Sequence, residues 1–213
     1  MATSNKHSSI ALYSHPNSIY SHLVRFVMAE KNVIYDSVEV EDGRTCEQLL
    51  EYNPYGEIPT LVDRSLVIYT PSIILEYLDE RYPHPPLLPV FPIARAETRL
   101  FLHRVEQDWY SLANRILKNG SDPEAEKDLK ETILSSTDAV RNTDYFLGEE
   151  FSIMDCYAAP LLWRLPMMNI TLTGSNAKLW QRYCSMLFSR ESFRSSLTAD
   201  EINQRALATG EGK

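Results

Sequence analysis

The chain has 213 residues, 44% of them hydrophobic and 23% charged, which is typical of a globular protein with one large domain or two small ones. No apolar run reaches the roughly 18 residues of a membrane span, and the polar N-terminus has no hydrophobic stretch of the kind found in a secretory signal. The net charge is −8 and no cluster of Lys or Arg is present, which argues against direct nucleic-acid binding.

Three cysteines are present, at Cys46, Cys156 and Cys184, and no two have C-x-x-C spacing. An odd count without such spacing is typical of a reduced, cytoplasmic protein that has neither a disulfide framework nor a zinc site. We expect each cysteine to be a small buried hydrophobic residue. The sequence gives no reason to expect a metal or another cofactor.

The first part of the chain predicts a small α/β unit over residues 10–82, preceded by a disordered lead of residues 1–9. Apolar and polar residues alternate in the expected strands, and apolar residues recur every three or four positions in the expected helices. The order is β-α-β-α-β-β-α: strand 10–13, helix 20–32, strand 35–40, helix 45–52, a strand after Pro59, strand 66–69, and a helix from Thr70-Pro71 to the residue before Pro83.

The rest of the chain predicts an all-helical domain over residues 93–208, because long stretches there have helical spacing of apolar residues. Residues 83–92, with the sequence PHPPLLPVFP, form the joint between the two parts. The expected helices are 93–118, 124–142, 152–165, 177–189 and 200–207, of which 152–165 is almost wholly apolar and therefore buried.

Two local patterns have structural meaning. A cis bond occurs at about 5–6% of X-Pro positions in folded proteins, so a trans Ile58-Pro59 bond is the ordinary expectation. The surrounding order of elements nevertheless favours cis, with the Ile58 backbone turned outward to pair with an extended, peptide-like ligand. Ser152 and Asp155 have the spacing of a capping box at a helix start, so we expect a structural role for both.

These features together resemble the glutathione S-transferase superfamily over residues 10 to about 195. The features are the α/β unit, the Ile-Pro before its third strand, the helical second part and the Ser-x-x-Asp box on a buried helix. The resemblance implies an α/β thioredoxin-like N-terminal domain followed by an all-α C-terminal domain.

Longer stretches resemble one branch of that superfamily, the stringent starvation protein A family of RNA polymerase-associated proteins. They are IYSHLVRFVMAEK (19–31), EYLDERYPHPPLLPVFPIAR (76–95), VEQDWY (105–110) and FSIMDCYAAPLLWRLP (151–166). The resemblance implies a homodimer in which the N-terminal domain of one subunit packs on the C-terminal helices of the other. It also implies that Pro83, His84 and Pro85 form a pocket that contacts RNA polymerase holoenzyme, with Tyr82, Pro86 and Lys31 as weaker candidates for the same surface.

The resemblance to the transferases implies three requirements for activity. The tripeptide backbone pairs beside the cis-proline, an acidic residue and a serine at the third helix bind the γ-glutamyl carboxylate, and a residue near the first helix stabilises the thiolate. Here Thr70-Pro71 replaces the acidic residue and the serine, and proline offers neither an N–H nor a hydroxyl.

We further expect the Thr70 hydroxyl to be used by the helix cap. Ser18 aligns with the thiolate-stabilising serine, although a role in a turn or a helix cap is favoured for it. The glutathione site formed by Ile58, Pro59, Thr70 and Pro71 is therefore expected to be degenerate, and no catalytic residue is assigned.

The stretch from Asp79 to Pro92 contains five of the 12 prolines and would ordinarily be a stiff spacer. A spacer has no need for Tyr82, His84, Leu87, Leu88 and Phe91 among its prolines. Because proline fixes φ, these side chains would lose little entropy on binding a partner. We therefore expect a displayed recognition surface.

Three hypotheses remain open at this point. The first is a non-enzymatic transcription regulator that binds RNA polymerase holoenzyme with its housekeeping sigma factor and alters promoter use in starvation or acid stress. The second is a glutathione-dependent enzyme of zeta-like or omega-like type that uses Ser18 and Ile58-Pro59. The third is a structural partner that forms a heterodimer with a paralogous chain.

Overall fold

The computed structural model describes residues 9–41 and 46–210, which divide into two compact units. The first unit ends at Pro85 and also contains Ser195–Asp200, and the second unit comprises Pro86–Arg194 and the residues from Glu201 onward. The boundary after Pro85 lies inside the predicted proline-rich joint. The predicted lead of residues 1–9 lies, apart from Ser9, outside the described residues.

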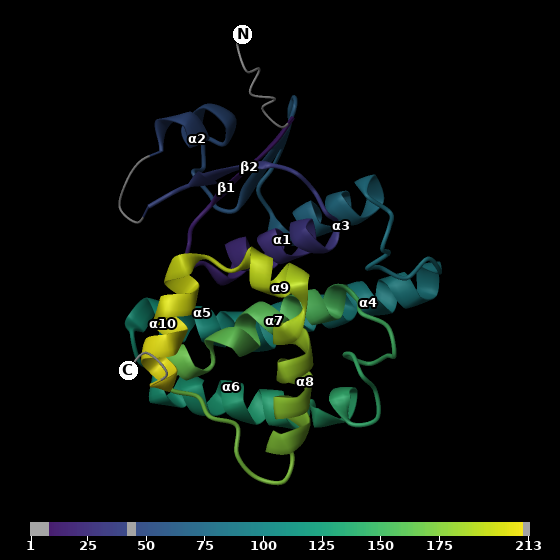
Figure 1. Ribbon diagram of the computed structural model, residues 1–213, viewed down its shortest axis with the longest axis vertical. Coiled ribbons are helices and arrows are strands. Elements are labelled where there is room, and N and C mark those ends of the chain that lie inside the picture. Colours follow the sequence, from purple (N-terminus) through teal and green to yellow (C-terminus); the bar gives the residue numbers. More distant parts are fainter. Residues whose placement is uncertain (1–8, 42–45, 211–213) are drawn as a thin grey trace. The chain divides into compact units, whose positions relative to one another are not determined.

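The first unit has the predicted β-α-β-α-β-β-α order (Figure 1). Its sheet has the strand order β2-β1-β3-β4, in which β1 pairs with β2 in parallel and with β3 antiparallel. The elements are β1 (Ile10–Ser14), α1 (Ile19–Glu30), β2 (Asp36–Glu39), α2 (Glu47–Tyr52), β3 (Thr60–Asp63), β4 (Leu66–Ile68) and α3 (Pro71–Arg81). This arrangement confirms the thioredoxin-like prediction.

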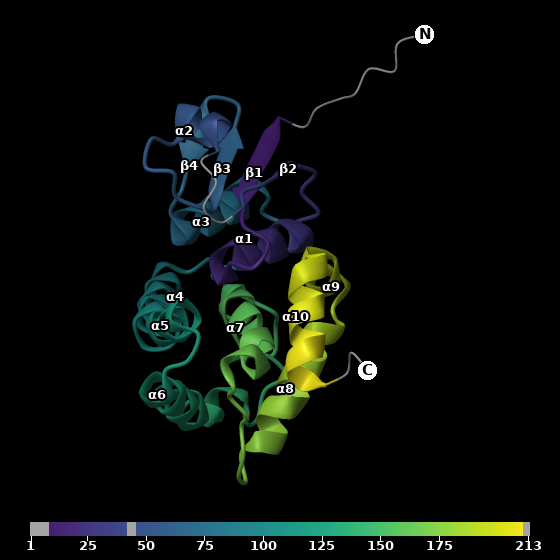
Figure 2. The ribbon, with the colours of Figure 1, turned by 90° about the vertical axis from the view of Figure 1, so that its left-hand side faces the viewer.

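The sheet of the first unit is covered on both faces, by α2 on one side and by α1 and α3 on the other (Figure 2). Successive side chains of a strand point to opposite faces. Tyr13 and Val62 accordingly pack with Leu49 of α2 in one buried cluster. Leu12 and Leu61 are also buried and point to the opposite face, which carries α1 and α3.

The segment Ser195–Asp200 belongs to the first unit because it bonds to α1 and to the loop before it. His22 Nε2 lies 3.1 Å from the Ser196 hydroxyl, and Arg25 Nε donates to the Ser196 carbonyl at 2.9 Å. Thr198 donates from its hydroxyl to the Pro16 carbonyl at 3.1 Å. The sequence analysis placed this segment in the helical domain. No pattern within the segment indicates that its hydrogen-bond partners lie more than 170 positions earlier in the chain.

The second unit is helical, as predicted, and the expected helix 93–118 is a continuous run of three segments. These are α4 (Pro92–Val105), a π-helical segment η1 (Glu106–Tyr110) and α5 (Ser111–Asn119). Gly120 ends the run in the left-handed conformation at φ 76°. The remaining helical elements are α6 (Pro123–Ser135), η2 (Thr137–Val140), α7 (Ile153–Arg164), η3 (Pro166–Met168), α8 (Ala177–Ser189), α9 (Glu191–Ser196) and α10 (Ala199–Thr209).

The core of the second unit forms around α7, which is buried along most of its length as the apolar sequence predicts. The Tyr110 hydroxyl of η1 donates to the Tyr157 carbonyl of α7 at 2.8 Å. Arg164 and Glu201 form an ion pair, and both side chains are almost inaccessible. None of the described helices is long and apolar enough to cross a bilayer.

Candidate functional site

The central feature of the candidate site is Lys31, which follows the last turn of α1. Its ammonium lies 2.6 Å from a carboxylate oxygen of Asp79 in α3, and the Lys31 side chain is fully buried. The same ammonium donates to the Tyr82 carbonyl at 2.8 Å and to the Pro85 carbonyl. One buried cation therefore joins the end of α1, the last turn of α3 and the loop that follows α3.

This arrangement follows from the backbone groups at the end of α3. Tyr82 is the C-cap of that helix, and the last carbonyls of a helix have no partner within it. A cation is favoured there by the helix dipole as well as by hydrogen bonding. Asp79 is 94% buried, so its carboxylate needs a partner, and the Lys31 ammonium supplies one.

Pro83, His84 and Pro85 are all exposed, while Tyr82 is half-buried. The Arg81 guanidinium lies 5.6 Å from the centre of the Tyr82 ring. The His84-Pro85 peptide bond is cis, as is Ile58-Pro59. We call residues 82–85 the PHP loop. It displays one imidazole between two pyrrolidine rings, on a backbone held from beneath at Tyr82 and Pro85.

After the PHP loop the chain passes from the surface into the core of the second unit. Pro86 is exposed, but Leu87 and Leu88 are buried, with 2% and 5% of their surface accessible. The prediction that these two leucines belong to a displayed surface is therefore wrong. They anchor the start of the second unit, where the Leu87 carbonyl accepts a hydrogen bond from the Ile153 amide at 2.9 Å. Phe91 is 76% exposed, as expected.

Lys31 was predicted as a weaker candidate for the partner-binding surface. Because its side chain is buried, its role is structural. An ammonium that is fully buried and bonded to three oxygens does not reach a partner. It holds the backbone of the PHP loop at Tyr82 and Pro85 instead. Sequence reasoning missed Asp79 as the counter-charge. Its position in the last turn of an amphipathic helix gives no sign that it is buried.

Ser18 has the structural role that was favoured for it. It is the N-cap of α1, and its hydroxyl oxygen accepts a hydrogen bond from the Ser21 amide at 3.2 Å. The Ser21 hydroxyl in turn accepts from the His15 amide at 3.1 Å. These bonds satisfy one amide of the loop before α1 and one amide of the first turn of α1, and they need no ligand.

The structure differs from the predicted degenerate glutathione site at one residue, Thr70. Thr70 is the N-cap of α3 and Pro71 its first residue, as expected, but the Thr70 side chain makes no capping hydrogen bond. The prediction that this hydroxyl is used by the cap is therefore wrong. Because Thr70 is exposed, water can bind the first amides of the helix instead. Pro71 still argues against binding of the γ-glutamyl carboxylate, because proline has no N–H and no hydroxyl.

The capping box predicted at Ser152 and Asp155 is present at the start of α7. The Ser152 hydroxyl accepts from the Met154 amide at 3.3 Å, and Asp155 accepts from the Ser152 amide at 2.8 Å. Asp155 also accepts from the Phe146 amide at 2.9 Å and the Tyr183 hydroxyl at 2.7 Å. Burial raises the pKa of this carboxyl, and the hydrogen bonds it accepts act in the opposite direction.

The three cysteines are free, and only Cys156 is buried as predicted, whereas Cys46 and Cys184 are partly exposed. Burial raises the pKa of the Cys184 thiol to about 12, so this thiol is neutral and unreactive near neutral pH. Among the described residues no group of three or more His, Cys, Asp or Glu side chains could hold a metal ion.

Comparison with known proteins agrees with this fold. A model of the glutathione S-transferase N-terminal domain matches residues 12–86, and a model of the corresponding C-terminal domain matches residues 102–191. The solved structure of glutathione transferase Omega 3C from Trametes versicolor is 25% identical, with a TM-score of 0.78 and 90% of each chain covered. The fold and the two domain matches define a protein of the glutathione S-transferase class.

The curated relatives narrow this assignment. The "Stringent starvation protein A homolog" of Haemophilus ducreyi is 47% identical over 198 residues, which cover 92% of both chains. The protein of the same name from Coxiella burnetii is 42% identical over 203 residues, covering 94% of this chain and 97% of the relative. The chain belongs to the stringent starvation protein A family.

Proposed function

We propose that this protein is a transcription regulator that binds RNA polymerase holoenzyme through the PHP loop and does not act as an enzyme. The observation that carries the proposal is the loop itself: Pro83, His84 and Pro85 are exposed, and the buried Lys31 ammonium holds the backbone beneath them. The family to which the chain belongs supports the choice of polymerase as the partner.

The loop has the chemistry of a protein-recognition site. His84 can donate and accept hydrogen bonds at its two ring nitrogens, and the flanking prolines offer apolar surface without flexible side chains. Two ring-locked φ angles and the bonds to Lys31 leave little conformational entropy to lose on binding. Tyr82 and Pro86 would extend the contact on either side.

The finer parts of the proposal concern the complex. The holoenzyme would contain the housekeeping sigma factor, and binding would alter promoter use in starvation or acid stress. A homodimer would present two PHP loops. A heterodimer with a paralogous chain would present one such loop together with a different surface. Since the chain carries a net charge of −8, the contact would be with protein and not with DNA.

A second function is favoured by specific observations and deserves a direct test. Ser18 stands at the start of α1 and Ile58-Pro59 directly before β3, the positions at which a glutathione-dependent enzyme of zeta-like or omega-like type would stabilise the thiolate and pair with the tripeptide backbone. Against it stands Pro71, at the place where such an enzyme binds the γ-glutamyl carboxylate. Losing polar anchors worth about 1–3 kcal/mol each weakens binding by 10-fold to 100-fold or more.

Site-specific photo-crosslinking tests the proposed contact. A benzoyl-phenylalanine introduced in place of Tyr82 would lie beside His84, and the same residue in place of Tyr55 provides a control elsewhere in the first unit, at a side chain that is 75% exposed. Irradiation with purified holoenzyme should join the Tyr82 variant to a polymerase subunit and leave the Tyr55 variant unjoined. A crosslink from Tyr55 alone, or from neither position, would contradict the proposal.

A further inference from the structure

The strand β2 lies at one edge of the sheet of the first unit, and β4 lies at the other edge (Figure 2). The neighbour of β2 within the sheet is β1, with which it pairs in parallel. The Val40 amide, directly after β2, donates to the Ser14 carbonyl at 2.9 Å, which identifies the side of the strand that faces β1. Successive residues of a strand turn their backbone groups to alternate sides, so those of Val38 also face β1, whereas those of Ser37 and Glu39 face away from the sheet.

The outward backbone groups of β2 are accessible to another strand. Among the described residues, none forms a hydrogen bond with the amide or the carbonyl of Ser37 or Glu39. Both residues are exposed, so water can bind these groups. Such groups at a sheet edge form a template for an added strand, which replaces the water with backbone hydrogen bonds.

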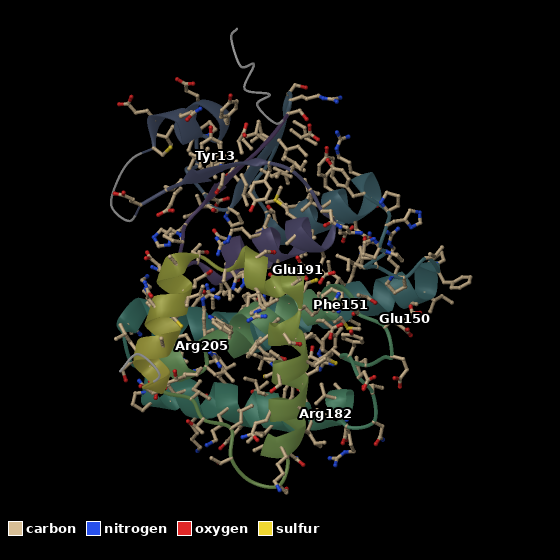
Figure 3. All side chains as sticks on the ribbon, in the orientation of Figure 1. Tyr13, Glu150, Phe151, Arg182, Glu191 and Arg205 are labelled. Atoms are coloured by element: carbon tan, nitrogen blue, oxygen red, sulfur yellow. The ribbon has the colours of Figure 1, made fainter. Side chains whose placement is uncertain are left out.

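An open groove lies beside β2, on the face of the sheet that carries α2. Tyr13 packs with Leu49 of α2 and therefore points to this face (Figure 3). Tyr52 of α2 is 43% exposed, and its ring centre lies 6.0 Å from that of Tyr13. An added strand would turn every second side chain toward this groove, where an apolar side chain would contact aromatic and aliphatic groups. The lining residues include Ala11, Tyr13, Tyr35, Val38, Tyr52 and Val62.

The segment that contains β2 is acidic. Residues 33–41 include Asp36, Glu39 and Glu41 and no Lys or Arg. Glu39 is exposed and points to the face opposite the groove, because side chains alternate along the strand. Antiparallel pairing of β2 with β2 of a second copy would place the two Glu39 carboxylates on one face within two positions of each other, which is unfavourable. A short, charged edge is thus protected against self-pairing, but it attracts a strand of opposite charge.

We propose that β2 binds an extended, basic segment of a partner protein as an additional strand of the sheet. The backbone of the segment would form hydrogen bonds with Ser37 and Glu39. Its Lys or Arg side chains would lie on the same face as the Glu39 carboxylate, and the apolar side chains between them would lie in the groove. This surface includes no residue of the PHP loop, so the proposal is tested separately from polymerase binding.

Fluorescence anisotropy with a labelled synthetic peptide tests the pairing. In this peptide lysine alternates with valine and phenylalanine, and it should bind saturably at one site per chain. Two further peptides have the same sequence and charge but carry N-methyl groups, one on every lysine and the other on every apolar residue. Only one of these sets of N–H groups can face β2, so one methylated peptide should bind at least about tenfold more weakly than the other. Equal binding of the two, or no saturable binding of the unmethylated peptide, would overturn the proposal.

Two variants connect the binding to β2. Ser37→Pro removes an N–H that faces away from the sheet, a change that an edge strand tolerates. It should weaken binding of the unmethylated peptide by about fivefold or more while the circular dichroism spectrum is retained. Glu39→Lys should also weaken binding by about fivefold or more, and Glu150→Lys, which makes the same change of charge at an exposed position of the second unit, should leave it unchanged. If Ser37→Pro fails to fold, the Glu39→Lys result decides. Unchanged affinity in either folded variant would refute the proposed site.

Discussion

Replacing Lys31 with Met removes the ammonium at the base of the PHP loop and retains most of the apolar side chain. The variant leaves the buried Asp79 carboxylate without its 2.6 Å partner and removes the donor to the Tyr82 and Pro85 carbonyls. The consequence concerns both stability and function, because the same ammonium holds α3, α1 and the loop together.

The expected loss of stability can be estimated from these contacts. Removing one partner of a buried ion pair costs about 3–5 kcal/mol. Each lost hydrogen bond to a charged group would add about 1.5–3 kcal/mol if it were independent. The contributions overlap, and water can enter beside the half-buried Tyr82, so we expect about 3 kcal/mol in total. A domain with a typical stability of about 5–15 kcal/mol would remain folded.

Urea unfolding followed by circular dichroism measures this loss. Tryptophan fluorescence would report on the second unit alone, because the tryptophans of this chain all lie there. The double variant Lys31→Met with Asp79→Asn should lose less than the sum of the single changes, since no buried charge is left unpaired. Lys178→Met, which removes an exposed ammonium on α8, should change stability by less than about 0.5 kcal/mol. A loss below about 1 kcal/mol for Lys31→Met, or strict additivity in the double variant, would refute the reasoning.

The remaining predictions concern the helix cap, its carboxyl and the transferase site. Ser152→Ala removes the cap of α7 and should cost about 1 kcal/mol in urea unfolding, and an unchanged midpoint would count against the cap. Burial raises the folded-state pKa of Asp155 above its usual 3.8, so the wild type should lose stability relative to Asp155→Asn as the pH rises from 3.8. The opposite trend between the two proteins would show that the hydrogen bonds outweigh burial. Calorimetry should detect no micromolar binding of glutathione, and a measured micromolar constant would support the enzyme hypothesis instead.

Local patterns were sufficient to predict most of the fold. Alternation and helical spacing identified the elements of both units, and the capping box was recognised from Ser152 and Asp155 alone, because its two bonds connect residues that are near in sequence. The short α9 was missed because its six residues are too few to show a helical period. The π-helical turns of η1 were missed because they preserve the apolar spacing of the helix around them.

The candidate site could be predicted only in part, because its organisation depends on contacts between distant residues. The exposed PHP loop was recognised from its composition, whereas its support was not, since Lys31 and Asp79 are 48 positions apart in the sequence. Leu87 and Leu88 look like members of the same apolar stretch as Phe91. Only the packing of the second unit shows that the leucines are buried and the phenylalanine is exposed.

The most direct test of the central claim is the dissociation constant of the fluorescently labelled protein for RNA polymerase holoenzyme, measured by anisotropy. His84→Ala is compared with His103→Ala, which removes an exposed imidazole on α4. The account predicts saturable binding that His84→Ala weakens by about fivefold or more, which corresponds to about 1 kcal/mol, and that His103→Ala leaves unchanged. Absence of saturable binding, or binding that is the same for the wild type and His84→Ala, would contradict it.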